Sequence, residues 1–130
     1  MWVPAFIRAA GMVALLATAG VTGQDVRPHA RVLVQTTLAA GLRHHEAKEV
    51  WDSMSAGDAL ELVREPANEH DSNAVRVDWN AHVLGYIPRG ENADVARQLD
   101  RGQPLRARIV HLARYRNHRR KLEIEIYLDL

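Results

Sequence analysis

The sequence predicts a mainly β fold, a small and mostly antiparallel barrel of six strands with one or two short helices. Three observations lead to this prediction. Short segments in which apolar and polar residues alternate recur along the chain, separated by Pro, Gly and Asn turn residues. Only one segment has clear helical periodicity. The chain has 130 residues, 47% hydrophobic and 25% charged, which suits one globular domain.

Six segments have the alternating, often β-branched composition of strands. Pro66 ends the second segment because it has no backbone N–H to donate, and Asn80-Ala81 is the tight connection of a hairpin. The apolar phase slips at Ile109-Val110, as it does at a β-bulge. The last segment alternates without interruption and places Tyr127 on the outer face. The six segments are residues 31–37, 59–65, 73–78, 82–87, 105–112 and 122–130.

Residues 91–101 are predicted to form the helix. Acidic residues lie in its first turn and basic residues in its last turn, as the helix dipole favours, and Gly102 follows in a capping position. Val95 and Leu99 lie four residues apart on one apolar stripe. Residues 41–54 are expected to be irregular or weakly helical.

The first 23 residues have the composition of a secretory signal peptide. A single charge at Arg8 precedes the apolar run of residues 9–19, and small residues follow it. The run is shorter than the ~20 apolar residues that a bilayer requires. We therefore expect residues 1–23 to be a signal peptide and residues 24–130 to be an exported domain, periplasmic or secreted, without a membrane span after cleavage. An uncleaved anchor and an N-terminal core helix are the alternatives.

The net charge of +1 conceals an uneven distribution. Residues 97–121 hold nine Lys or Arg and one Asp, a net charge of +8, whereas residues 24–96 have a net charge of −5. Such a basic segment is either a footprint for phosphate or a solvated face that balances an acidic neighbour. The chain has no cysteine, which excludes disulfides, thiolate zinc sites and a cysteine nucleophile.

Residues 62–89 resemble the HIRAN domain. The pattern of that family contains a strand ending in R-[ED]-P, a loop N-x-x-D-x-N-A-[VI] and a hairpin ending in G-[YH]-[IL]-P. An upstream G-[LF]-[RQ]-[YH]-[YH] element, a downstream helix and a basic strand extend the resemblance over residues 32–128. The four motifs are Arg64-Glu65-Pro66, NEHDSNAV from Asn68 to Val75, Gly85-Tyr86-Ile87-Pro88 and Gly41-Leu42-Arg43-His44-His45.

The resemblance implies an OB-like barrel with a pocket for the free 3′ end of single-stranded DNA. It implies that Asp71 accepts a hydrogen bond from the 3′ hydroxyl, where a carboxylate also repels a terminal phosphate. It further implies phosphate or backbone contacts for Arg43 and Arg89. The other implied contacts are hydrogen bonds from Asn68 and Tyr86 to the terminal nucleotide and base stacking on His44, His45 and His70.

The chain departs from the eukaryotic members of the family at two kinds of position. Its three histidines occupy positions where those members have stacking tyrosines, and Ala67 replaces an asparagine. Histidine offers less stacking area and titrates near pH ~6.5 when unperturbed. We therefore expect weaker DNA binding that strengthens at acid pH.

Less specific interpretations of the same residues stay open. Asp71 and Asn73 are common loop residues, so Asn73 is expected to be structural and Asp71 to combine both roles. The motif at residues 64–66 is expected to be a strand end rather than a contact, and Trp51 to pack in the core. Residues 114–121 are expected to form a basic hairpin tip, either solvated or in contact with a nucleic-acid backbone.

Taken as a whole, these patterns predict a non-catalytic nucleic-acid-binding module for single-stranded DNA ends. The first alternative is an exported structural or protein-interaction domain, with another protein as its partner. The second is a metal-binding hydrolase of acid anhydrides. The family-level descriptions of zinc binding and hydrolysis fit the RING and ATPase neighbours that this chain lacks, and the sequence contains no metal-ligand spacing and no P-loop. We expect no catalytic residue, no metal ligand and no cofactor.

Overall fold

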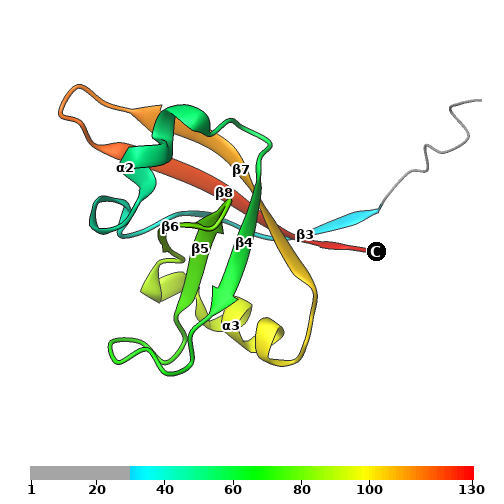
Figure 1. The fold of residues 1–130 in the computed structure, drawn as a ribbon. Coiled ribbons are helices and arrows are strands. Elements are labelled where there is room, and N and C mark those ends of the chain that lie inside the picture. Colours follow the sequence, from blue (N-terminus) through cyan, green and yellow to red (C-terminus); the bar gives the residue numbers. More distant parts are fainter. Residues whose placement is uncertain (1–29) are drawn as a thin grey trace, which may run out of the picture.

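The computed structural model describes residues 30–130, so the expected signal peptide at residues 1–23 lies outside the described residues. The described chain forms six strands and two short α-helices, with three 3-10 turns between them (Figure 1). The strands are β3 (Arg31–Leu38), β4 (Ala59–Arg64), β5 (Val75–Trp79), β6 (His82–Tyr86), β7 (Leu105–Arg114) and β8 (Arg120–Asp129). The helices are α2 (Ala47–Val50) and α3 (Ala93–Asp100), and the 3-10 turns are η3 (Leu42–His44), η4 (Trp51–Ser53) and η5 (Arg89–Glu91).

All strand pairs are antiparallel, and the strand order is β3-β8-β7-β4-β5-β6. This confirms the predicted six-stranded, mainly β fold. The word barrel applies only loosely, because the sheet is not closed and β3 and β6 form its edges. One isolated bridge between Ala40 and Tyr86 connects the chain that follows β3 to the end of β6. A β-carbon added at Gly85 would lie 2.3 Å from the carbonyl oxygen of Ala40, so this approach requires glycine.

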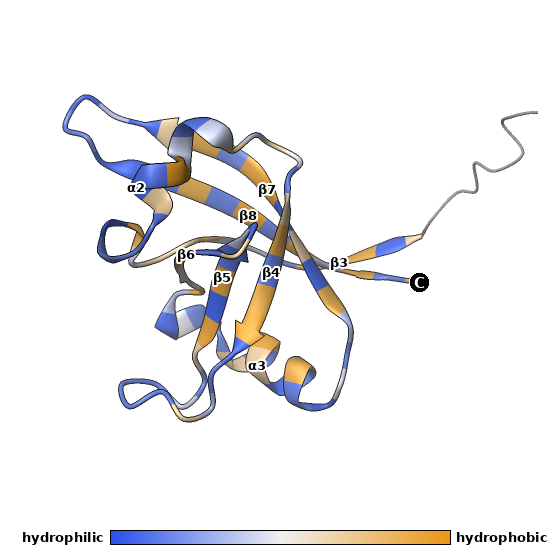
Figure 2. Ribbon diagram, viewed as in Figure 1, coloured by the Kyte–Doolittle hydropathy of each residue, from blue (hydrophilic) through white to orange (hydrophobic). Residues whose placement is uncertain are grey.

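The long hairpin of β7 and β8 confirms the predicted phase slip. The pairing register shifts between Ile109 and His111, which is a β-bulge, and Val110 points outward with 39% of its surface exposed. Along both strands, apolar and polar residues alternate, as the colours of Figure 2 show. The predicted hairpin tip is also present, because the N–H of Tyr115 donates to the carbonyl of Arg119 over 2.8 Å.

The core is aliphatic and centres on β8. Leu122, Ile124 and Ile126 are fully buried there and pack with side chains from β5, β6, β7 and α3. Burial of each such side chain stabilises the folded state by about 1.5–3 kcal/mol. Trp51 is buried in the same core, as predicted. Tyr127 lies on the outer face, as the alternation predicts, but it is nearly fully buried.

Tyr127 is only 8% exposed because two arginines cover its ring. The guanidinium carbons of Arg31 and Arg108 lie 4.5 Å and 5.6 Å from the ring centroid. The tyrosine is therefore on the outer face in register but is covered by cation–π contacts from the two neighbouring strands.

Helix α3 begins two residues later than predicted. Glu91 belongs to the preceding 3-10 turn η5, and its carboxylate accepts a 2.7 Å hydrogen bond from the hydroxyl of Thr37 on β3. The predicted apolar stripe packs into the core through Val95. Gly102 follows the helix with a left-handed φ of 83°, as expected for a capping glycine. None of the helices within residues 30–130 has the length and apolar character needed to cross a membrane.

Candidate functional site

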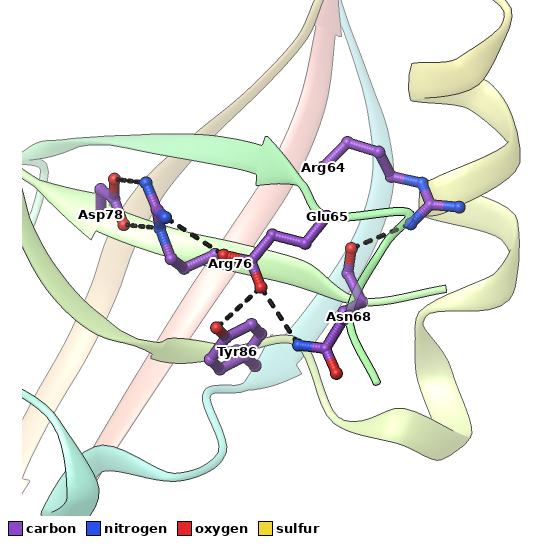
Figure 3. Close-up of polar contacts among 7 residues, drawn as sticks. Arg64, Glu65, Asn68, Arg76, Asp78 and Tyr86 are labelled. Atoms are coloured by element: carbon purple, nitrogen blue, oxygen red, sulfur yellow. Dashed lines mark hydrogen bonds and ion pairs between the residues drawn. The ribbon is translucent and has the colours of Figure 1, made fainter. Parts of the chain in front are cut away.

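Glu65, the first residue after β4, is the centre of a polar network at the end of the small β4–β5–β6 meander (Figure 3). Its Oε1 accepts a 2.8 Å hydrogen bond from the hydroxyl of Tyr86 and a 3.1 Å bond from Nδ2 of Asn68. Its Oε2 accepts a 3.1 Å bond from Nη1 of Arg76. Three separate parts of the chain thus converge on one carboxylate.

This network fixes the protonation of its members. Partial burial raises the pKa of Glu65, but the hydrogen bonds from Tyr86, Asn68 and Arg76 outweigh it and hold the pKa below its usual value. Burial, and the bond to Glu65, raise the pKa of Tyr86. Near neutral pH, Glu65 is therefore ionised and Tyr86 keeps its proton. Because that proton is donated to Glu65, the Tyr86 oxygen is left as a hydrogen-bond acceptor.

Arg76 anchors the network to the sheet. Its Nε and Nη2 donate to the two carboxylate oxygens of Asp78 at 2.8 Å each, a bidentate pair along one face of β5. The hydrogen bonds to Asp78, followed by those to Glu65, raise the pKa of Arg76 further above its ordinary value. The guanidinium thus bridges two carboxylates and orients Glu65 toward the loop that follows it.

The loop after β4 is shaped by its own side chains. Oδ1 of Asn68 accepts the backbone N–H groups of His70 at 2.9 Å and Asp71 at 3.2 Å, and Oδ1 of Asp71 accepts the N–H of Asn73 at 2.9 Å. These are Asx turns. They hold the shape of the loop and occupy both lone pairs of the Asn68 carbonyl oxygen. Because Nδ2 of Asn68 donates one hydrogen to Glu65, its second amide hydrogen remains for another partner.

Asp71 is a fixed and partly exposed carboxylate. Its Oδ2 accepts a 2.7 Å hydrogen bond from Nδ2 of Asn92, whose residue is only 1% exposed. Asn92 precedes α3 as its N-cap but makes no side-chain cap bond there, because its amide points to Asp71 instead. Partial burial raises the pKa of Asp71, but the bonds from Asn73 and Asn92 and the charges of Arg89 and Arg64 together lower it.

The eight residues predicted for the site fall into two neighbouring groups. Asn68, Asp71, Tyr86 and Arg89 are linked as described above, and we call them the Asp71 cluster. The ring of His45 lies 5.5 Å from that of Tyr86, tilted by 55°, so His45 borders this cluster. His70 is exposed on the same loop.

Arg43 and His44 belong to the second group. They line a hollow of about 860 Å³ between η3, α2 and the tip of the β7–β8 hairpin, which we call the basic hollow. The loop of Asp71 does not line this hollow. The arginines expected beside Asp71 are therefore divided: Arg89 acts on Asp71, whereas Arg43 lies with the basic tip.

Sequence reasoning missed three residues of this region. Glu65 was expected to belong to a strand end rather than to contact nucleic acid, and β4 does end beside it at Arg64. Its place at the centre of the network was not predicted. Arg76 and Asn92 carried no role in the prediction. The R-E-P motif contained a signal for Glu65, whereas no local pattern marks Asn92, whose partner lies 21 residues away.

Within residues 30–130, no three histidine, aspartate or glutamate side chains gather closely enough to hold a metal ion. The described residues therefore do not fit the zinc site that family-level descriptions mention.

Comparisons with known proteins give one family model and two solved structures of similar fold. The sequence profile of the HIRAN domain matches residues 32–130. A protein from Lactobacillus plantarum with a known crystal structure is similar over 78% of this chain and 98% of its own, with 29% identity and a TM-score of 0.68. The HIRAN domain of human HLTF is similar in fold, with 20% identity, a TM-score of 0.57 and coverage of 75% of this chain and 78% of that chain. A comparison with curated protein sequences gives no match.

Proposed function

Because this chain belongs to the HIRAN domain family, whose members are known as nucleic-acid-binding modules, we propose that residues 24–130 form a non-catalytic module for the 3′-hydroxyl ends of single-stranded DNA. The free end of a strand exposes a terminal hydroxyl, base faces and phosphates. Recognition therefore needs a hydrogen-bond acceptor, flat side chains and cations in one region.

The observation that carries the proposal is the state of Asp71. Its carboxylate is ionised, partly exposed and held by bonds from Asn73 and Asn92, with Arg89 close enough to lower its pKa. Each oxygen keeps a lone pair for a further donor. An oriented anion of this kind accepts a hydrogen bond from a hydroxyl and repels a terminal phosphate, so it selects a free 3′ end.

The other predicted residues take roles that their existing bonds allow. Asn68 offers its remaining amide hydrogen to the terminal nucleotide, and Tyr86 offers its oxygen as an acceptor. Arg89 neutralises a phosphate near Asp71, and Arg43 neutralises one further along the strand. The exposed rings of His44 and His70, with His45 beside Tyr86, provide stacking surfaces.

The test compares two oligonucleotides of one sequence that end in a 3′ hydroxyl or a 3′ phosphate, by fluorescence anisotropy. We expect the wild type to prefer the hydroxyl by roughly ten-fold and Asp71→Asn to lose that preference. Glu69→Gln removes one charge from an exposed position of the same loop and is the matched control. If the wild type binds both oligonucleotides equally well, the proposal of end recognition is rejected. A wild type that binds no DNA favours the protein-interaction domain.

We also propose that the domain acts after export, based on the signal-like composition of residues 1–23. Fractionation of cells that express the full chain with a C-terminal tag tests this. The tagged protein is expected outside the cytoplasm, with a mature N-terminus near residues 20–24. Deletion of residues 2–23 is the control and should retain the protein inside. Cytoplasmic full-length protein with an intact N-terminus would reject export.

A further inference from the structure

The basic hollow contains only positive charge. Arg43 comes from η3, Lys48 from α2, and Arg119 and Arg120 from the tip of the β7–β8 hairpin, while no Asp or Glu lines it. Within residues 30–130, none of these four side chains forms an ion pair. Charges gathered from three separate elements without an acidic partner are adapted to an external anion.

Arg120 adds an independent observation. Its Nε is buried and has no hydrogen-bond partner among the described residues. The guanidinium carbon lies 5.7 Å from the ring centroid of the buried Trp51, which limits its freedom, and Nη1 reaches only a long 3.4 Å contact with the carbonyl of His118. Because the hydrogen-bonding capacity of this guanidinium is largely unused within the described residues, its outer amino groups remain available to an anion in the hollow.

The hairpin tip has a fixed shape that presents its charges. The N–H of His118 donates to the carbonyl of Tyr115 over 2.9 Å, and the N–H of Arg119 donates to Oδ1 of Asn117 over 3.1 Å. His118 has a left-handed φ of 65°. Binding of an anion here would require little additional ordering of the backbone.

The hollow and the Asp71 cluster are continuous along the chain. Arg43 and His44 line the hollow, and the next residue, His45, packs against Tyr86 of the cluster. A strand whose 3′ end lay at Asp71 would therefore have His45 between its terminal nucleotide and the hollow. The volume of about 860 Å³ leaves room for more than one phosphate group with its water.

We infer that the basic hollow binds internal phosphates of the same single strand, several nucleotides before the 3′ end. This inference rests on the proposed function. Lys48, Arg119 and Arg120 become binding residues, and affinity depends on strand length as well as on the free end. Guanidinium groups suit this role because their planar donors match phosphate oxygens.

The test uses oligothymidines of 3 and 12 nucleotides with a free 3′ hydroxyl and a 5′ fluorophore, with anisotropy measured from 50 to 200 mM salt. The double variant Lys48→Gln/Arg119→Gln removes two exposed charges from the hollow. We expect it to bind the 12-mer roughly ten-fold more weakly and the 3-mer as well as the wild type. The slope of log K against log salt for the 12-mer should become shallower by about 1.4, since each single-strand phosphate contact contributes about 0.7.

Arg97→Gln/Arg101→Gln removes two exposed charges from the α3 region, away from the hollow, and is the matched control. If the hollow variant binds the 12-mer like the wild type while the preference for a 3′ hydroxyl persists, the inference is overturned and the proposed function stands. An equal loss for both lengths also overturns it, because the residues would then act at the terminal nucleotide. A wild type that binds neither strand rejects the proposed function and the inference with it.

Discussion

The hydroxyl of Tyr86 donates a 2.8 Å hydrogen bond to Oε1 of Glu65, which joins the end of β6 to the first residue after β4. The same oxygen accepts from Asn68, and the other oxygen accepts from Arg76 on β5. One carboxylate thereby ties the loop of the Asp71 cluster to two strands of the sheet. The loop owes its position to this contact as well as to its own turns.

Replacing Glu65 by Gln is expected to destabilise the domain by about 1–3 kcal/mol. The amide cannot satisfy three donors, and Arg76 loses one of its two carboxylates. Urea unfolding followed by circular dichroism measures this. Glu61→Gln, on the same strand but exposed and outside the network, should change stability by less than about 0.5 kcal/mol. Equal effects of the two variants would contradict the central role of Glu65.

The stability of the domain should fall below about pH 4.5. Glu65 and Asp71 have folded-state pKa values below their ordinary values of 4.5 and 3.8, so unfolding takes up protons in acid. Their stabilising effect is complete above those ordinary values and is lost as the pH falls through the lower folded values. Urea midpoints from pH 7 to pH 3 test this. The difference between wild type and Glu65→Gln should shrink toward pH 3, and a constant difference would mean that ionisation of Glu65 does not stabilise the fold.

The strands were predictable because their information is local. Alternation along residues 122–130 and the slip at Ile109-Val110 depend only on neighbouring residues, and the pairing of β7 with β8 confirms both. The burial of Tyr127 and the start of α3 could not be predicted, because residues distant in the sequence determine them. Tyr127 is covered by arginines of the adjacent strands, and Glu91 leaves the predicted helix because it accepts a bond from Thr37.

In the site, too, the features formed by neighbouring residues could be predicted and those formed by distant residues could not. The loop residues Asn68, Asp71 and Asn73 could be predicted as a unit because their turns are formed within six residues. Glu65 could not be ranked as central, since its partners come from β5 and β6 as well as from the loop. Nor could the sequence indicate that Arg43 lies with the hairpin tip and Arg89 with Asp71, because only the folded chain separates them.

Gly85→Ala is expected to destabilise the domain by about 1–3 kcal/mol. The new β-carbon would lie 2.3 Å from the carbonyl oxygen of Ala40, so the bridge between Ala40 and Tyr86 must open. Gly90→Ala is the matched control, because a β-carbon there meets no atom within 4 Å. Thermal unfolding of both variants should show a clear loss for the first and little change for the second. A Gly85→Ala variant with wild-type stability would mean that the bridge tolerates displacement.

Asn92→Ala is expected to weaken end recognition without affecting the basic hollow. The buried Asn92 amide orients Oδ2 of Asp71 and helps to lower its pKa. Its loss leaves the carboxylate held only through Oδ1, by the N–H of Asn73, and moves the pKa upward. The destabilisation should be about 1 kcal/mol, because water replaces the lost donor at a partly exposed oxygen. The preference for a 3′ hydroxyl over a 3′ phosphate should fall several-fold.

Asn73→Ala is the matched control for this variant. It removes an exposed amide side chain from the same loop but retains the backbone N–H that donates to Asp71. It should leave the preference for the free end unchanged, and both variants should keep the advantage of the 12-mer over the 3-mer. If Asn92→Ala kept the full 3′-hydroxyl preference, the orientation of Asp71 would not depend on Asn92. If it abolished the length advantage, the two groups of residues would not act separately, since the side chain of Asn92 donates to the Asp71 cluster and does not line the basic hollow.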